Sequence, residues 1–197
     1  CFQSFIQNCD ESICKIQQIK AEAKLHLAEL QKTGDYEIET LCLMDENLSY
    51  FAEGFFLQRE QLLAEGKLDH PRFRYAHQFA EADKIVIAAP FWDLSFPALL
   101  KVYIENLCVD GITFHTDEHG LHGLCKADHM VFLTARGAFY TDTPLEQGSR
   151  YLEQMAGFFG IERYDCVAAE GLDIGAWPVE ELMDKAKVQA TEVAKTF

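Results

Sequence analysis

The segment from Lys84 to Ala89 reads KIVIAA, and it constrains the fold more than any other stretch. A strand with one face in water alternates apolar and polar residues, but this run is apolar at consecutive positions. Central strands of parallel sheets have that character, because helices cover both of their faces. The run therefore predicts an α/β protein with a parallel sheet between two layers of helix.

The remaining sequence alternates between short β-type runs and longer amphipathic stretches, as crossover connections require. This alternation predicts a three-layer sandwich with a five-stranded parallel sheet in the order 2-1-3-4-5. The expected strands are 1–7, 36–43, 84–89, 130–134 and 166–169. The expected helices include a first one that ends at Gly34, then 46–65, 71–82, 97–108, 145–159 and one from Pro178, with a hairpin-like excursion at 112–124.

Length and charge restrict the possible functions. The 197 residues suit one domain, which we expect to span 1–197. The chain carries 17 basic and 32 acidic residues, for a net charge of −15. Such a surface repels phosphate backbones and anionic lipid heads, so we expect no nucleic-acid and no membrane partner.

Cysteine usage and hydropathy indicate a compartment. The seven cysteines are odd in number and form no C-x-x-C motif, which favours reduced thiols in a cytoplasmic protein. The longest apolar run, Ile85 to Trp92, is too short to cross a bilayer and contains a proline. We also find no signal-peptide pattern and expect a cytoplasmic location.

In an open parallel sheet, ligands bind beyond the carboxyl ends of the strands, where the strand order reverses. This rule directs attention to three loops: 8–14, 90–96 and 134–140. The second loop has the most specific sequence, since Phe91, Trp92 and Leu94 leave the strand end together. They are suited to form an apolar wall for a planar ligand, with loop amides bonding its heteroatoms.

The segment 89–105, APFWDLSFPALLKVYIE, resembles the flavin loop of the FMN-dependent NAD(P)H:quinone oxidoreductase and azoreductase family. That family shows a strand, a proline, an aromatic-rich turn and a Pro-Ala/Ser-x-Leu-Lys-x-Tyr-Ile helix. Further similarities follow in the family's order, at Gly111–Phe114, Gly120–Leu124, Thr134–Ala138 and Ala169–Gly171. The resemblance runs from about Tyr36 to the end of the chain.

The resemblance implies a flavodoxin-like fold and a flavoenzyme that works by a ping-pong cycle. NAD(P)H would reduce FMN, and a small-molecule acceptor (a quinone, azo or nitro compound) would reoxidise it. The flavin carries the chemistry, so no catalytic side chain is implied. The implied cofactor contacts are Ser12, Pro90, Phe91, Trp92, Asp93, Leu94, Thr134, Ala135, Arg136, Gly137 and Ala138.

Members of this family are usually homodimers with the flavin near the interface, so the resemblance also implies a homodimer. Clustered aromatic residues beyond the needs of a core often mark interfaces. The pairs Phe55–Phe56 and Phe139–Tyr140 are the candidates for a wall shared between subunits.

Two positions depart from the family pattern. Asp93 stands where the family usually has asparagine, and an ionised carboxylate there repels an anionic reduced flavin. The expected phosphate loop, 8–15, offers Ser12 and Lys15 but also Asp10 and Glu11. These acids favour an alternative function, a flavodoxin-fold binding or regulatory protein that has lost FMN.

A third hypothesis comes from the hairpin. His115, His119, His122 and Cys125 carry imidazole and thiol groups at a spacing that suits Zn²⁺. The competing interpretation is a polar hairpin that happens to carry histidines, with Cys125 buried where the next strand approaches. Because the same stretch already matches the family's hairpin, we predict no metal cofactor.

Overall fold

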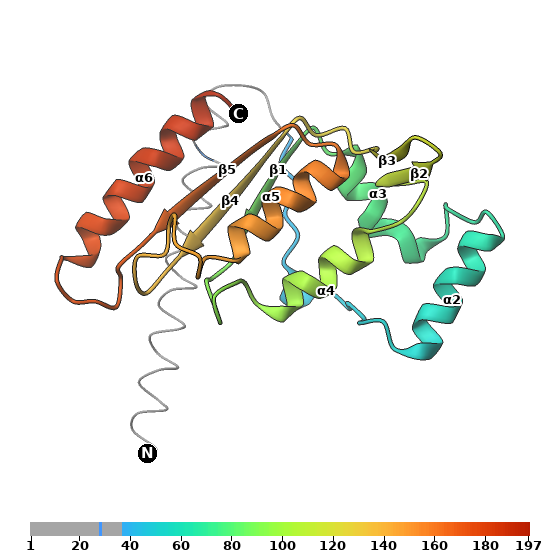
Figure 1. Ribbon diagram of the computed structural model, residues 1–197, viewed down its shortest axis with the longest axis horizontal. Coiled ribbons are helices and arrows are strands. Elements are labelled where there is room, and N and C mark those ends of the chain that lie inside the picture. The colour runs from blue at the N-terminus through green and yellow to red at the C-terminus, as the bar shows by residue number, and fades with distance from the viewer. Residues whose placement is uncertain (1–27, 29–36) are drawn as a thin grey trace, which may run out of the picture.

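A three-stranded parallel sheet forms the centre of the protein (Figure 1). The computed structural model describes residue 28 and residues 37–197. The strands β1 (Lys84–Ala88), β4 (His129–Ala135) and β5 (Arg163–Ala169) lie in the order β1-β4-β5. Strand β4 is buried along its whole length and lies between the other two strands. Its Phe132 pairs with Ile87 of β1, and its Leu133 pairs with Val167 of β5. The three strands expected at 84–89, 130–134 and 166–169 are therefore adjacent in the sheet.

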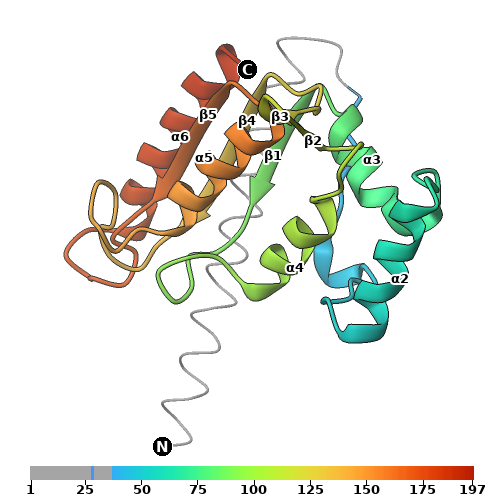
Figure 2. The same cartoon turned by 45° about the vertical axis from the view of Figure 1, so that its right-hand side comes forward.

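Helices cover both faces of this sheet (Figures 1 and 2). Helix α6 (Val179–Lys195) covers one face, where Met183 and Ala186 pack against Val131 and Leu133 of β4. The opposite face is covered by α3 (Arg74–Glu81), α4 (Ala98–Leu107) and α5 (Gly148–Phe159). Alternate residues of β4 thus enter two different cores, as the period of a strand requires.

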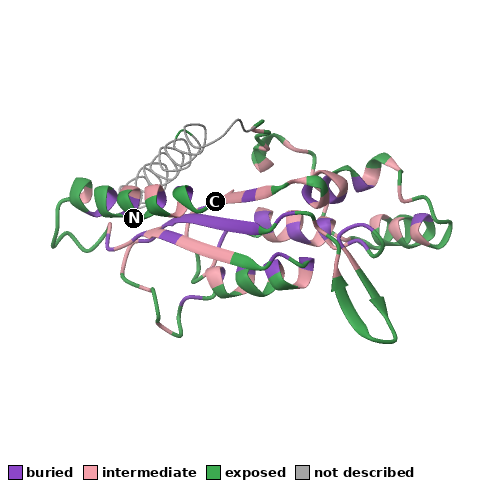
Figure 3. Cartoon of the chain, turned by 90° about the horizontal axis from the view of Figure 1, so that it is seen from above, coloured by how far each residue is buried: buried purple, intermediate pink, exposed green. Residues whose placement is uncertain are grey.

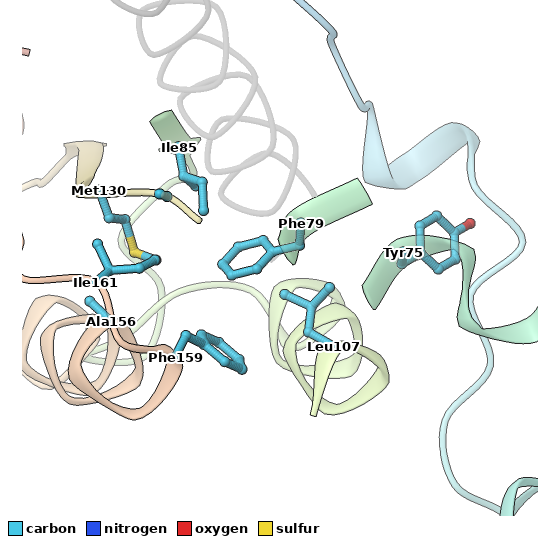
Figure 4. Packing of buried hydrophobic residues seen from close by; sticks show 9 residues of the cluster. Tyr75, Phe79, Ile85, Leu107, Met130, Ala156, Phe159 and Ile161 are labelled. Carbon is cyan, nitrogen blue, oxygen red and sulfur yellow. The ribbon is translucent and has the colours of Figure 1, made fainter. Parts of the chain in front are cut away.

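The core beneath α3, α4 and α5 is aromatic at its centre (Figure 4). Phe79 of α3 and Phe159 of α5 meet edge to face with ring centroids 5.1 Å apart. Leu107 lies beside them, and Met130 of β4 closes the cluster on the sheet side. Edge-to-face aromatic pairs add to the free energy of apolar burial, so this contact fixes how the helices sit on the sheet.

Two elements lie at the periphery. The hairpin of β2 (Phe114–Asp117) and β3 (Gly120–Gly123) is antiparallel and mostly exposed (Figure 3). Helix α2 (Glu53–Ala64) buries only Leu62. Two short 3₁₀ helices flank α2: η1 (Leu43–Asp45) precedes it, and η2 (Pro71–Phe73) leads from it into α3. Among the described residues, no helix has both the length and the hydropathy that a membrane crossing requires.

The expected strand 36–43 is wrong over its described residues, because 37–42 form no strand and η1 follows directly. The alternation that suggested a strand has another cause: Leu41 and Leu43 pack against the core, while Cys42 between them is exposed. Strand 1–7 and the helix that ends at Gly34 lie outside the described residues. The five-stranded order is therefore not confirmed.

The expected helix 46–65 is too long, since α2 begins only at Glu53. Asn47 and Ser49 lie in the extended stretch before it, and the side chains of such residues favour turns over helix interiors. The remaining helices lie where they were predicted, with ends shifted by a few residues. The hairpin also forms inside its expected range, with Gly120 at a φ of 120°.

Candidate functional site

The carboxyl ends of β1, β4 and β5 lie at one edge of the sheet, because the strands are parallel. The loops that leave them, 89–97, 136–147 and 170–178, gather at this edge (Figures 1 and 2). Pro90–Leu94 and Thr134–Ala138, both expected in the site, are therefore brought to the same end of the molecule. Ser12 and the rest of the expected phosphate loop lie outside the described residues.

The loop after β1 contains a tight turn. Trp92 and Ser95 exchange two backbone hydrogen bonds of 2.9 and 2.8 Å around Asp93 and Leu94. Both central residues have positive φ, 50° and 66°, which is unusual for residues other than glycine. The turn leaves Trp92, Asp93 and Leu94 exposed at the edge of the sheet. The carbonyl of Leu94 accepts from Gln147 N–H at 3.0 Å, which ties the turn to the start of α5.

The loop after β4 continues the pairing with β5 beyond the sheet. Arg136 N–H donates to the Ala169 carbonyl at 2.8 Å, and Asp173 N–H donates to the Gly137 carbonyl at 2.9 Å. Among the described residues, the N–H groups of Gly137 and Ala138 have no hydrogen-bond acceptor. A Cβ at Gly137 would lie 2.1 Å from Asp173 Oδ2, so glycine permits this close approach of the two loops.

Aromatic rings surround these loops. Phe91 contacts Tyr140 with ring centroids 4.6 Å apart, and Phe139 meets Trp177 edge to face at 5.5 Å. Phe139 also lies directly over Gly171, where a Cβ would come within 2.6 Å of the ring. Phe139 and Trp177 are both exposed, as is Trp92. Together they form an apolar surface, suited to a planar ligand, around the Gly137 and Ala138 N–H groups, which have no acceptor among the described residues.

A buried arginine lies beneath this surface. The Arg136 side chain is 2% exposed. Its Nη1 donates to Thr141 Oγ1 at 3.1 Å and to Glu170 Oε1 at 3.0 Å, and its Nη2 donates to Glu146 Oε1 at 3.1 Å. The guanidinium carbon lies 5.2 Å from the centre of the Phe91 ring. The side chain therefore contacts residues of the loops after β1, β4 and β5.

Glu170 is the partner that joins two of the loops. Its Oε1 accepts from the backbone N–H groups of Tyr140 and Thr141, at 2.8 and 2.9 Å, in addition to the guanidinium of Arg136. Burial raises the pKa of this carboxyl, but these donors outweigh burial and hold the pKa below its usual value. Glu170 is thus ionised at neutral pH.

The sequence identified Arg136 only as one of the implied cofactor contacts and did not point to Glu146, Thr141 or Asp173. Of the partners of Arg136, only Glu170 could have been found from the sequence, because it lies in the Ala-Glu-Gly motif after the last strand. Thr134 was expected in the site, but its side chain is fully buried. Its Oγ1 has no hydrogen-bond partner among the described residues.

The histidines of the hairpin do not converge on a metal site. His115 Nδ1 lies 3.1 Å from Asp110 and His122 Nε2 lies 3.1 Å from Asp117, so each ring has its own carboxylate. Burial raises the pKa of the Cys125 thiol to about 12, which disfavours the thiolate that zinc needs. Within residues 37–197, no three histidine, cysteine, aspartate or glutamate side chains are grouped to hold a metal ion.

A cavity of about 330 Å³ lies away from this edge, between residues 47–49, α2, η2 and α4. The arginine side chains that line this cavity already form hydrogen bonds and an ion pair within the protein. Arg72 donates to Gln58 and to the Phe55 carbonyl, and Arg74 pairs with Glu46. The carboxyl edge of the sheet is the better candidate site, since it combines exposed aromatic rings with N–H groups that have no acceptor in residues 37–197.

Comparison with known proteins identifies the family of the chain. A family model described as "Flavodoxin-like fold" matches residues 18–194. The FMN-dependent NADH:quinone oxidoreductase 2 of Clostridium acetobutylicum is 45% identical over 170 residues, covering 85% of this chain and 84% of that protein. A Clostridium beijerinckii protein named FMN-dependent NADH:quinone oxidoreductase is 40% identical over 173 residues, with coverage of 85% and 84%.

Solved structures also show similarity to proteins of this fold. The crystal structure of azoreductase from Bacillus anthracis matches with a TM-score of 0.81 and 28% identity. The match covers 91% of this chain and 92% of the azoreductase. The family model spans most of the chain, and the two clostridial relatives are 45% and 40% identical to it. The chain belongs to the flavodoxin-like fold family.

Proposed function

We propose that this protein is an FMN-dependent NADH:quinone oxidoreductase of the azoreductase type. The observation that carries the proposal is the meeting of loops 90–94 and 134–138 at the carboxyl edge of the sheet. The names of the clostridial relatives and of the Bacillus azoreductase support the same activity. The chain would act as a single domain.

The residues at this edge fit the ring end of FMN. Phe91, Trp92 and Leu94 offer apolar surface, and the N–H groups of Gly137 and Ala138, without an acceptor in the part of the chain that the structure describes, can donate to ring heteroatoms. Donors at that position stabilise the negative charge of a reduced ring. The exposed Asp93 can accept a hydrogen bond from a ring N–H, but its charge opposes the reduced form. We place the phosphate at loop 8–15, with Ser12 as a contact.

Bound FMN would supply a centre that accepts hydride from NADH and returns electrons to a quinone, azo or nitro acceptor. The protein's part is to position the two substrates and to limit water. Trp92, Leu94, Phe139 and Trp177 leave one exposed apolar face at this edge. We infer that NADH and the acceptor occupy this face in turn, which is the alternation of a ping-pong mechanism.

We further propose a homodimer in the cytoplasm. Phe56 and Phe139 are exposed and could contact a second subunit. Phe55 and Tyr140 are partly covered by Arg72 and Phe91 of the same subunit. Four cysteines in the described part of the chain are free thiols, which suits a reducing compartment supplied with NADH.

The first experiment is a visible absorption spectrum of the purified protein after addition of FMN and desalting. We expect a retained flavin spectrum that bleaches with NADH and recovers with a quinone. No retained flavin, at low salt and with excess FMN, would reject the proposal and favour a flavodoxin-fold protein without cofactor.

A pair of variants locates the site. Trp92→Ala should weaken FMN binding about two- to tenfold, the range for loss of one aromatic contact. Val188→Ala removes an exposed apolar side chain from α6 and should leave the dissociation constant unchanged. Equal affinities in the two variants would place the ring elsewhere.

A further inference from the structure

Arg136 and Glu170 bring together segments that are far apart in the sequence. A buried charge is tolerated only when it is paired and hydrogen-bonded, and the two Nη groups of Arg136 meet this condition through Thr141, Glu146 and Glu170, while its Nε has no partner among the described residues. The two carboxylates differ in what else they bind. Glu146 accepts from Ser149 N–H at the start of α5, whereas Glu170 accepts from the loop after β4.

Glu170 determines where the backbone of Tyr140 lies, because Tyr140 N–H donates to its Oε1 at 2.8 Å. The ring of Tyr140 in turn contacts Phe91, which also lies near the Arg136 guanidinium. The loop that carries Gly137 and Ala138 runs directly into Tyr140. The ion pair is therefore connected to both parts of the candidate site, the aromatic wall and the N–H groups of Gly137 and Ala138.

We propose that Arg136 and Glu170 are positioning residues, whose ion pair holds loop 137–141 and the Phe91–Tyr140 contact in the geometry that receives the flavin ring. The inference rests on the proposed function. Neither side chain touches the ring in this account: Glu170 acts through the N–H groups of Tyr140 and Thr141, and Arg136 acts by holding Glu170.

Glu146 provides a matched control. The Glu146 and Glu170 side chains are 6% and 14% exposed, and both accept from the same guanidinium, so Glu146→Ala and Glu170→Ala each remove one carboxylate from Arg136. Only Glu170→Ala also removes the acceptor for Tyr140 and Thr141. A difference between the two variants therefore measures positioning of the loop and not the loss of one charge beside the arginine.

Two readouts are compared. The first is amide hydrogen exchange of Tyr140 and Thr141 in the protein without FMN, followed by NMR; we expect Glu170→Ala to speed exchange at least tenfold and Glu146→Ala to change it less than twofold. The second is the dissociation constant for FMN, expected to rise at least tenfold in Glu170→Ala and less than threefold in Glu146→Ala. Glu170→Gln, which keeps an acceptor oxygen, should recover part of both losses.

Equal effects of the two truncations on both readouts would overturn the inference, as would unchanged FMN affinity in a folded Glu170→Ala variant. If Glu170→Ala does not fold, Glu170→Gln and Glu146→Gln are compared in the same two measurements, and equal values again overturn it. Failure of the wild-type protein to bind FMN would instead reject the proposed function, which separates the two outcomes.

Discussion

Asp93 occupies a left-handed backbone conformation, with φ of 50°, at the tip of the turn that follows β1. Asparagine tolerates this conformation as well as aspartate does, so Asp93→Asn changes the charge without straining the turn. We expect the variant to bind FMN about two- to fivefold more tightly, the range for one exposed charge interaction. The midpoint potential of the bound flavin should also become more positive, because the reduced ring is no longer repelled.

Titration with FMN measures the affinity, and equilibration with redox dyes measures the midpoint potential of the bound flavin. Glu118→Gln, which neutralises an exposed carboxylate on the distant hairpin, is the control and should alter neither. An unchanged potential in Asp93→Asn would mean that residue 93 does not face the ring.

His129 predicts how stability depends on pH. Its side chain is fully buried; Nε2 bonds Asp165 at 2.8 Å, and Nδ1 has no partner among the described residues. Burial lowers the pKa of His129, and this effect exceeds the opposing effect of Asp165. The folded protein therefore binds this proton less readily than the unfolded chain, whose histidines titrate near pH 6.5. Its contribution to stability is complete above about pH 6.5 and is lost as the pH falls through the lower, folded-state pKa.

Urea denaturation between pH 8 and pH 5 tests this prediction. The free energy of unfolding of the wild type should decrease toward pH 5 more steeply than that of His129→Gln, which has no ring to protonate. Parallel curves for the two proteins would show that His129 is not the group responsible.

At the residue level, local sequence predicted which loops meet at the carboxyl edge of the sheet but not the hydrogen bonds of the Arg136 side chain. Its partners Glu146 and Glu170 are 10 and 34 residues away along the chain. No periodicity or spacing relates them, since the strand order brings Glu170 beside Arg136 and the entry to α5 brings Glu146. The side-chain role of Arg136 therefore required the fold.

Among the elements, the hairpin is fixed by contact between two glycines. A Cβ on Gly123 would lie 2.0 Å from the backbone nitrogen of Gly160, which ends α5 with φ of 85°. Backbone atoms cannot move aside as a side chain does, so Gly123→Ala should lower the free energy of unfolding by about 1–3 kcal/mol. Gly157→Ala, in α5 with nothing within 4 Å of its Cβ, should raise it by about 0.5–1 kcal/mol.

Chemical denaturation of the two variants beside the wild type gives both values. A Gly123→Ala protein as stable as the wild type would show that the hairpin can separate from α5 without cost. The comparison is informative because both substitutions add the same methyl group near the same end of the same helix.

The strands illustrate what sequence can show at the level of elements. Strands 84–89, 130–134 and 166–169 were predicted because each is rich in apolar residues, and all three form, with β4 and β5 longer than expected. The expected strand 36–43 alternates instead, and alternation reports which side chains are buried, not whether the backbone pairs with a neighbour. Leu41 and Leu43 are partly buried there without any strand over 37–43.

At the scale of the whole molecule, the order β1-β4-β5 brings the loops of three strands to one edge, and the alternation of strands and helices was enough to predict that edge. The other half of the expected ligand site, loop 8–15, stays a prediction. The overall charge provides a way to examine it without mutation, because FMN carries a phosphate dianion and riboflavin has the same ring without it.

With a net charge of −15, the protein should repel FMN at long range. The Debye length falls from about 30 Å at 0.01 M salt to about 10 Å at 0.1 M, so added salt screens this repulsion. We expect the association rate of FMN, followed by stopped-flow quenching of flavin fluorescence, to rise severalfold over that interval, while the rate for neutral riboflavin stays constant. An FMN rate that falls with salt would mean that a local cationic site, as Lys15 and the start of the first helix would form, attracts the phosphate more strongly than the acidic surface repels it. Association rates that are equal for the two ligands and independent of salt would show that neither the acidic surface nor a local cationic site affects the phosphate.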